Sequence, residues 1–182
     1  GCSAEAGIRL RFEGTGGVPL AQLAPGLLPL YLAGSESVPG ELYRQLAGET
    51  LAVIARRPDS ADASAALSLP IPEQVGFDRD EALLPAELRS FRGYRLLTEY
   101  FACPERFLFV ALGGLDRAFK ASGEQCDIVL LFSRSSPVLA NAISPANFKL
   151  FATPAINLFE KQLGRVQVDP HRHEYHVIPD RT

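Results

Sequence analysis

The sequence predicts a β-rich α+β fold, and three patterns support this class. Residues 8–13 alternate strictly between apolar and charged side chains, which is typical of a strand with one buried face. Residues 107–112 and 128–132 are strongly apolar runs of strand length, which predicts central strands covered on both sides. Residues 86–102 repeat apolar side chains at three- and four-residue steps, which predicts one longer amphipathic helix.

The region before residue 57 is predicted to form a first β-rich subdomain, residues 1–56. We expect the apolar side chains of the alternating strand to face inward: Ile8, Leu10 and Phe12. Three more elements follow in order: a strand at 28–32, a short helix at 41–47 and a strand at 50–56. Gly48 stands where the short helix is expected to end.

Residues 57–86 are predicted to be a connector to a second β-rich subdomain, residues 87–182. This stretch contains a patch rich in Ala and Ser and two prolines, Pro70 and Pro72, which favour extended structure in the residues before them. One short strand is expected inside it, near residues 66–69.

The second subdomain opens with the amphipathic helix. Four side chains form its apolar stripe, and we expect that stripe to pack inward: Phe91, Tyr94, Leu97 and Phe101. The helix ends before Pro104. After the two central strands, residues 145–159 are predicted to be helix or turn, and residues 165–168 and 175–178 a closing pair of strands.

A weak internal repeat is also present. The first two strands, and the two central strands of the second half, are each separated by about 20 residues, and a helix candidate follows each pair. Two similar β-sandwich-like subdomains with short helices would produce this pattern, and so would chance, because regular strand spacing is common in β-rich folds.

The composition excludes several classes of protein. With 18 Lys and Arg against 21 Asp and Glu, the net charge is −3, which argues against a strongly basic nucleic-acid binder. No apolar run reaches the roughly 20 residues that a bilayer span needs, so we expect no direct membrane insertion. Three Cys in 182 residues favour reduced thiols and a cytoplasmic location over a disulfide scaffold.

Two features of the sequence bear on whether the chain is processed. The absence of Met predicts a processed product or an internal segment of a longer chain. The opening residues Gly1-Cys2-Ser3 are similar to a lipoprotein processing site, so a lipid-anchored envelope protein is one alternative.

All three His residues lie in one hexapeptide: His171, His173 and His176. On a strand, His171 and His173 would point the same way, and Glu174 could complete a metal site. This pattern allows a metal-dependent enzyme as a second alternative. The other interpretation is a polar turn before a strand, because no second ligand cluster is evident elsewhere.

Other motifs of chemistry are incomplete. Asp78 opens a stretch resembling a calcium loop, but Leu83 and Arg89 occupy the positions of its glycine and its final acidic residue. No phosphate-binding loop and no Gly-x-Ser-x-Gly elbow is present. Cys103 and Cys126 are interpreted as small buried residues. We therefore assign no catalytic residue and expect no cofactor.

Arg89, Arg92 and Arg95 recur every three residues along the amphipathic helix. They predict either a charged edge facing solvent, with Arg95 paired to Glu99 four residues later, or an interface with a protein partner.

The order of several motifs resembles one family. The first block runs Val75-Gly76-Phe77-Asp78-x-Asp80-Glu81-Ala82-Leu83-Leu84-Pro85, then Ser90-Phe91-x-Gly93-Tyr94-Arg95-Leu96-Leu97-x-Glu99-Tyr100-Phe101, then Pro104-Glu105-x-Phe107-Leu108-Phe109. The second runs Asn147-Phe148-x-Leu150, Thr153-Pro154-x-x-Asn157-Leu158-Phe159 and His173-Glu174-Tyr175-x-Val177. Together they closely resemble the TssF family, also called VasA or ImpG, of bacterial type VI secretion systems. Cys103 departs from the pattern, which has an aromatic residue there.

The resemblance implies a structural function. A TssF-like subunit assembles with TssG-like and TssK-like subunits into baseplate wedges around a VgrG-type spike hub, and the baseplate starts assembly of the contractile sheath. It implies a multimeric, non-enzymatic, cytoplasmic protein recruited to the inner-membrane-associated apparatus. The family's chain is considerably longer, so the resemblance also implies an internal fragment.

Overall fold

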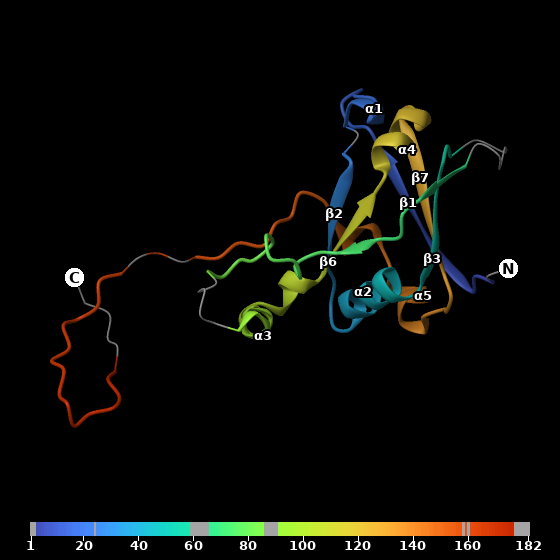
Figure 1. The fold of residues 1–182 in the computed structure, drawn as a ribbon. Coiled ribbons are helices and arrows are strands. Elements are labelled where there is room, and N and C mark those ends of the chain that lie inside the picture. The colour runs from blue at the N-terminus through green and yellow to red at the C-terminus, as the bar shows by residue number, and fades with distance from the viewer. Residues whose placement is uncertain are drawn as a thin grey trace.

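The computed structural model describes residues 3–23, 25–58, 66–85, 91–157, 159 and 161–176. It confirms the α+β class: two four-stranded antiparallel sheets carry several short helices, and an extended arm leaves the body (Figure 1). Within these residues, no helix has the length and apolar character needed to cross a membrane.

The first sheet contains the alternating strand. Its order is β1 (Ala6–Glu13), β7 (Gln125–Phe132), β3 (Thr50–Arg56) and β4 (Leu67–Leu69). Burial alternates along β1 as predicted, and β7 is central, with most of its residues buried. Arg11 lies opposite Asp127 in the register, and its guanidinium binds that buried carboxylate at 2.7 and 3.0 Å.

The second sheet has the order β5 (Glu73–Gln74), β6 (Phe109–Gly113), β2 (Leu27–Leu32) and β8 (Phe148–Lys149). All five residues of β6 are buried, which confirms the prediction of a central strand. The predicted start at Phe107 is wrong, because a 3₁₀ turn, η2 (Pro104–Phe107), occupies these positions before the strand begins.

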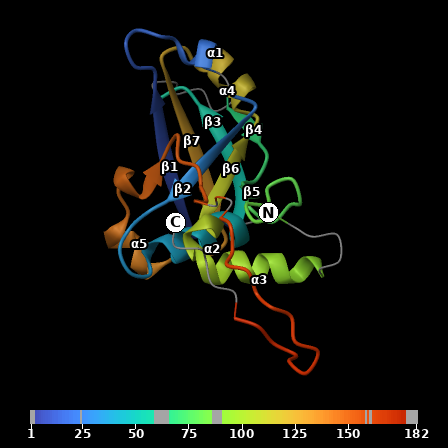
Figure 2. The ribbon, with the colours of Figure 1, turned by 90° about the vertical axis from the view of Figure 1, so that its left-hand side faces the viewer.

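The helices pack around the two sheets (Figures 1 and 2): α1 (Leu20–Leu23), α2 (Val38–Gly48), α3 (Arg92–Ala102), α4 (Leu115–Ser122), α5 (Pro137–Ala142) and the 3₁₀ turn η3 (Pro145–Asn147). One core cluster contains side chains from both sheets, from Leu30 and Leu112 on one to Val53 and Ile128 on the other. The described residues of both predicted β-rich regions thus share one hydrophobic core.

The division into two separate subdomains is therefore not what the topology has. β1 and β3 of the first region pair with β7 of the second, and β2 pairs with β6 and β8. The connector at 57–86 contributes β4 to the edge of one sheet and β5 to the edge of the other. A local sequence pattern predicts that a strand forms and which face is buried, but it does not say which distant strand it pairs with. The pairing between the two regions is therefore not evident from the sequence.

The internal repeat is visible in the topology. The order β1, α1, β2, α2, β3 is matched by β6, α4, β7, α5, β8. The two copies exchange strands: β1, β7 and β3 form one sheet in the same relative order as β6, β2 and β8 in the other. Helix α1 packs against its counterpart α4, and α2 against α5. These pairings favour two copies of one unit over coincidence.

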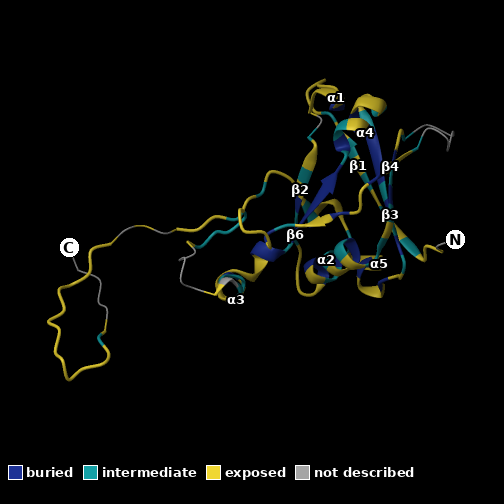
Figure 3. Cartoon of the chain, viewed as in Figure 1, coloured by how far each residue is buried: buried dark blue, intermediate teal, exposed yellow. Residues whose placement is uncertain are grey.

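The last described part of the chain is the arm, residues 150–176, which runs away from the body (Figure 3). Residues 165–168 form no strand there, so the predicted closing pair is wrong in its first member, and the second lies partly outside the described residues. An isolated pair of short strands is only marginally stable in water, so whether it forms depends on packing against other parts of the chain.

Candidate interaction surface

The most unusual element of the fold is α3, because its aromatic side faces solvent. Tyr94 is 65% exposed, Leu97 55% and Phe101 81%, and Phe91 just before the helix is 70% exposed. The prediction that this stripe packs inward is wrong. We call the exposed side chains of this helix and its start the aromatic face: Phe91, Tyr94, Leu97, Tyr100 and Phe101.

The opposite side of α3 is charged and buried. The carboxylate of Glu99 is only 2% exposed and accepts hydrogen bonds from Arg95 at 3.3 Å and from Arg106 of η2 at 2.5 Å. It also accepts the backbone N–H groups of Leu83 and Leu84, each at 3.0 Å. Four donors thus replace the water that a carboxylate loses on burial, which is the condition for burying a charge.

The two guanidiniums extend this network into the preceding loop. Arg95 donates to the carbonyl oxygens of Phe77 and Asp78, both at 3.2 Å. Arg106 donates to the carbonyl oxygen of Gly76 at 3.1 Å and to that of Glu81. The network therefore fastens residues 76–84 to α3 and η2.

The same loop is closed by the side chain of Glu81, which accepts the N–H groups of Gly76 at 2.7 Å and Asp78 at 3.1 Å. Gly76 has a φ of 106°, and a Cβ at this position would lie 3.3 Å from Nη1 of Arg106. Only glycine fits this conformation without strain.

The electrostatics of Glu99 follow from these contacts. Burial opposes its ionisation, but the hydrogen bonds from Leu84, Arg106 and Leu83 together outweigh burial and hold the pKa of Glu99 below its ordinary value. The carboxylate is therefore ionised at neutral pH, and the inner side of α3 is a compensated ionic cluster.

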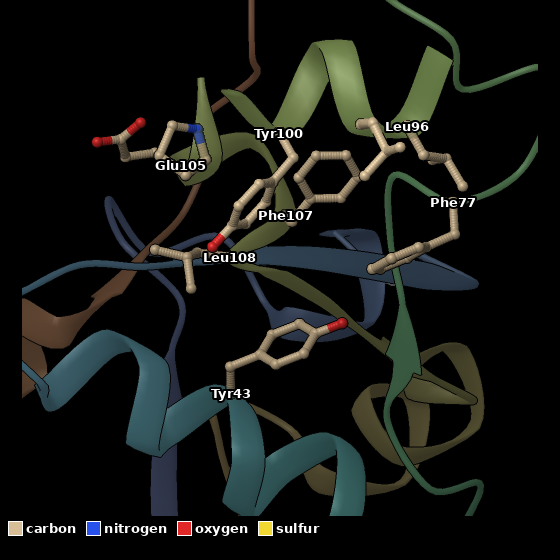
Figure 4. A pocket seen from close by; sticks show the side chains of 9 residues that line it. Tyr43, Phe77, Leu96, Tyr100, Glu105, Phe107 and Leu108 are labelled. Atoms are coloured by element: carbon tan, nitrogen blue, oxygen red, sulfur yellow. The ribbon is translucent and has the colours of Figure 1, made fainter. Parts of the chain in front are cut away.

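A pocket of about 510 Å³ opens beside the aromatic face, between α2 and α3 (Figure 4). Its lining is almost wholly apolar and comes from four separate segments: Tyr43, Phe77, Leu96, Leu97, Tyr100, Pro104, Glu105, Phe107 and Leu108. The buried ring of Phe107 lies 5.1 Å from the ring of Phe77 and 6.2 Å from that of Tyr100. The volume suits one or two large apolar side chains.

Of the three arginines in the predicted interface, Arg95 is the one whose side chain lies in the described part of the structure. Arg95 pairs with Glu99 as predicted, but its side chain is 12% exposed and is used internally. Arg92 begins α3, with a side chain outside the described part of the structure, and Arg89 lies outside the described residues. An interface that uses Arg89 or Arg92 stays a prediction.

The histidine cluster lies on the arm. His171, His173 and His176 are exposed, and Nδ1 of His171 lies 3.3 Å from a carboxylate oxygen of Asp169. Among the described residues, no group of three or more His, Cys, Asp or Glu side chains could hold a metal ion. The opening Gly1-Cys2, on which the lipid-anchor alternative depends, lies outside the described residues.

The two cysteines in the described part of the chain differ in exposure. Cys126 is buried as predicted, whereas Cys103 is exposed, with Sγ 3.6 Å from a carboxylate oxygen of Glu105. The expectation that Cys103 is buried is wrong, because it follows the end of α3 on the side that faces solvent.

The chain is similar in sequence to proteins of one known family. A family model described as "Type VI secretion system, TssF" matches residues 2–182. The "Type VI secretion system component TssF1" of Pseudomonas aeruginosa strain PAO1 is 42% identical over 180 residues, which are 98% of this chain and 29% of the relative. The chain thus spans less than a third of that relative's length.

A solved structure is similar as well. A chain in the cryo-electron microscopy structure of the type VI secretion system TssK-TssF-TssG baseplate subcomplex superposes with a TM-score of 0.70 at 25% identity. The match covers 96% of the present chain and 32% of that chain.

Proposed function

Because this chain belongs to the type VI secretion system TssF family, we propose that it is a structural part of a secretion-system baseplate. In this role it assembles with a TssG-like and a TssK-like subunit into a wedge. The observation that carries the proposal is the match over 96% of the chain, at a TM-score of 0.70, to about a third of one chain in a solved TssK-TssF-TssG subcomplex.

The mechanism is burial of surface between subunits. The aromatic face supplies large side chains with little conformational entropy to lose, which are enriched at the energetically dominant positions of interfaces. It lies in the block of motifs that carries the family pattern, so the surface and the family point to the same residues. We propose that the chain acts by binding and not by catalysis.

The wider setting is proposed from membership of the family alone. Wedges that contain this chain surround a VgrG-type spike hub, and the completed baseplate starts sheath assembly. The protein is placed on the cytoplasmic side of the inner membrane and recruited to the secretion apparatus there.

The test is reconstitution. The whole protein is co-expressed with a TssG-like and a TssK-like subunit, and the complex is analysed by size-exclusion chromatography and mass spectrometry. We expect the three proteins to elute together in a fixed ratio. Elution of this protein apart from both partners at micromolar concentration would refute the proposal.

A second arm of the experiment tests the predicted arginine interface. Charge reversal at both Arg89 and Arg92 is expected to lower recovery of the TssG-like subunit in a pull-down. Unchanged recovery removes these two residues from the interface and leaves the baseplate assignment intact. Arg95 is excluded from this variant, because its guanidinium supports the loop at Phe77.

A further inference from the structure

The aromatic face and the pocket beside it form one continuous candidate docking site. Leu97 and Tyr100 belong to both: each is more than half exposed, and each lines the pocket. Exposed aromatic side chains next to an apolar hollow are the composition of an interface centre, in which a partner's side chain fills the hollow.

This site is formed before any partner arrives. The ionic cluster of Glu99, Arg95 and Arg106 fixes the orientation of α3 and ties it to η2, which supplies the pocket's floor at Phe107. A rigid site loses little conformational entropy on binding, so more of the contact energy appears as affinity.

The charge at the rim indicates the chemistry of the occupant. Among the described residues that line the pocket, Glu105 is the only ionisable acid or base apart from the tyrosines. Glu105 is exposed, and its carboxylate lies 3.6 Å from the thiol of Cys103 and pairs with no cation among the described residues. In Figure 4 it lies at the edge of the pocket. A Lys or Arg on the partner would complement it.

Two occupants from this protein itself fit less well. A second copy of this face brings no Lys or Arg to meet Glu105, because the described residues of the aromatic face and of the pocket include neither. The described part of the chain's own arm runs away from the body (Figures 1 and 3), and none of its residues is among the described residues that line the pocket.

We propose that the site receives an apolar segment of another baseplate subunit. One large apolar side chain of this segment enters the pocket, its neighbours lie on the aromatic face, and a nearby Lys or Arg meets Glu105. The pocket is lined chiefly by helices and turns, so the contact is made through side chains, as in recognition of an amphipathic helix in a groove. The inference rests on the proposed function and adds the surface and the partner's chemistry.

Site-specific photo-crosslinking tests it. A photoreactive phenylalanine derivative replaces Leu97 in the whole protein, which is co-expressed with the TssG-like and TssK-like subunits. The same probe at Leu23 of α1 is the matched control, because Leu23 is 52% exposed and Leu97 55%. We expect the probe at Leu97, and not at Leu23, to capture a peptide of a partner subunit that contains large apolar residues and a Lys or Arg.

Two rim variants test the charge. Glu105→Lys is expected to lower the crosslinking yield at Leu97 by at least about threefold, with Glu105→Gln intermediate. Equal yields for the three proteins would remove the ion pair from the proposal and overturn it in this form.

The remaining outcomes separate this inference from the baseplate assignment. If the three subunits elute together but Leu97 captures a second copy, another segment of its own chain or nothing, the docking site is wrong and the assignment stands. If the subunits do not elute together, the assignment itself fails and the inference fails with it.

Discussion

The buried carboxylate of Glu99 gives the sharpest test of how this domain holds its aromatic face outward. Glu99→Gln keeps the shape of the side chain and one carbonyl oxygen, which can still accept the N–H groups of Leu83 and Leu84. The other oxygen becomes an NH₂ group, which cannot accept the bonds from Arg95 and Arg106. Two guanidinium donors are then left facing a donor inside the protein.

The size of the effect follows from burial. Glu99 and Arg106 are each 2% exposed at the side chain, so water cannot replace the lost bonds. Two hydrogen bonds to charged groups contribute about 1.5–3 kcal/mol each, and removing one partner of a buried ion pair costs about 3–5 kcal/mol. We therefore expect Glu99→Gln to lower the free energy of unfolding by about 3–5 kcal/mol, a large part of the stability of an ordinary domain.

The assay is urea unfolding followed by far-UV circular dichroism, because the chain has no Trp for fluorescence. Glu13→Gln is the matched control, since Glu13 is exposed and its carboxylate accepts a hydrogen bond from the neutral amide of Gln125 at 2.9 Å. A surface substitution of this kind changes the free energy of unfolding by about 0.5 kcal/mol or less. A loss below about 1 kcal/mol for Glu99→Gln, equal to the control, would refute the claim that the ionic cluster holds α3 in place.

Three further predictions concern backbone, charge and surface. Gly76→Ala should lower the free energy of unfolding by about 1–3 kcal/mol because of its φ of 106°, whereas Gly40→Ala, inside α2 with open space around it, should raise it by about 0.5 kcal/mol; urea unfolding of the two variants checks both signs. The hydrogen bond from Arg11 of β1 lowers the pKa of Asp127 in the folded state, so the carboxylate of Asp127 binds a proton more readily in the unfolded state. The stability from the ionised carboxylate is present above about pH 5 and is lost as the pH falls below about 4. Asp127→Asn should cost about 1–3 kcal/mol at pH 7 and make the acid loss shallower, as measured by unfolding between pH 7 and 3. Finally, Tyr94→Ser combined with Leu97→Ser should change the free energy of unfolding by no more than about 1 kcal/mol, because both side chains are exposed; a loss above about 2 kcal/mol would show that the aromatic face belongs to the core.

The strands were predictable because each carries its own burial signal. The alternation at Ile8, Leu10 and Phe12 matches the observed alternation in β1, and the range 50–56 coincides with β3. Helix α4 was missed although Leu115, Ala118 and Phe119 have helical spacing and are all buried.

The direction of α3 was not predictable in the same way. Its periodicity separates an aromatic side from a charged side but does not say which side is buried. The outcome depends on Arg106 and on the N–H groups of residues 83 and 84, which lie on other segments and neutralise Glu99 only in the folded chain. The pocket was missed for a related reason, because its lining comes from four segments that no local pattern connects.

The internal repeat explains where such a site can lie. The two copies run from β1 to β3 and from β6 to β8, and their exchanged strands build both sheets and the shared core. Helix α3 and the loop at 76–84 lie in the segment between the copies and have no counterpart in either. A side chain in the repeated part is constrained by the packing of the shared core, whereas the inserted segment is held together by the ionic cluster, whose residues all lie between β3 and β6. We therefore expect Glu99→Gln, on the buried side of α3, to weaken partner capture at Leu97 as well as to lower the free energy of unfolding, although Glu99 is buried and does not itself touch the partner.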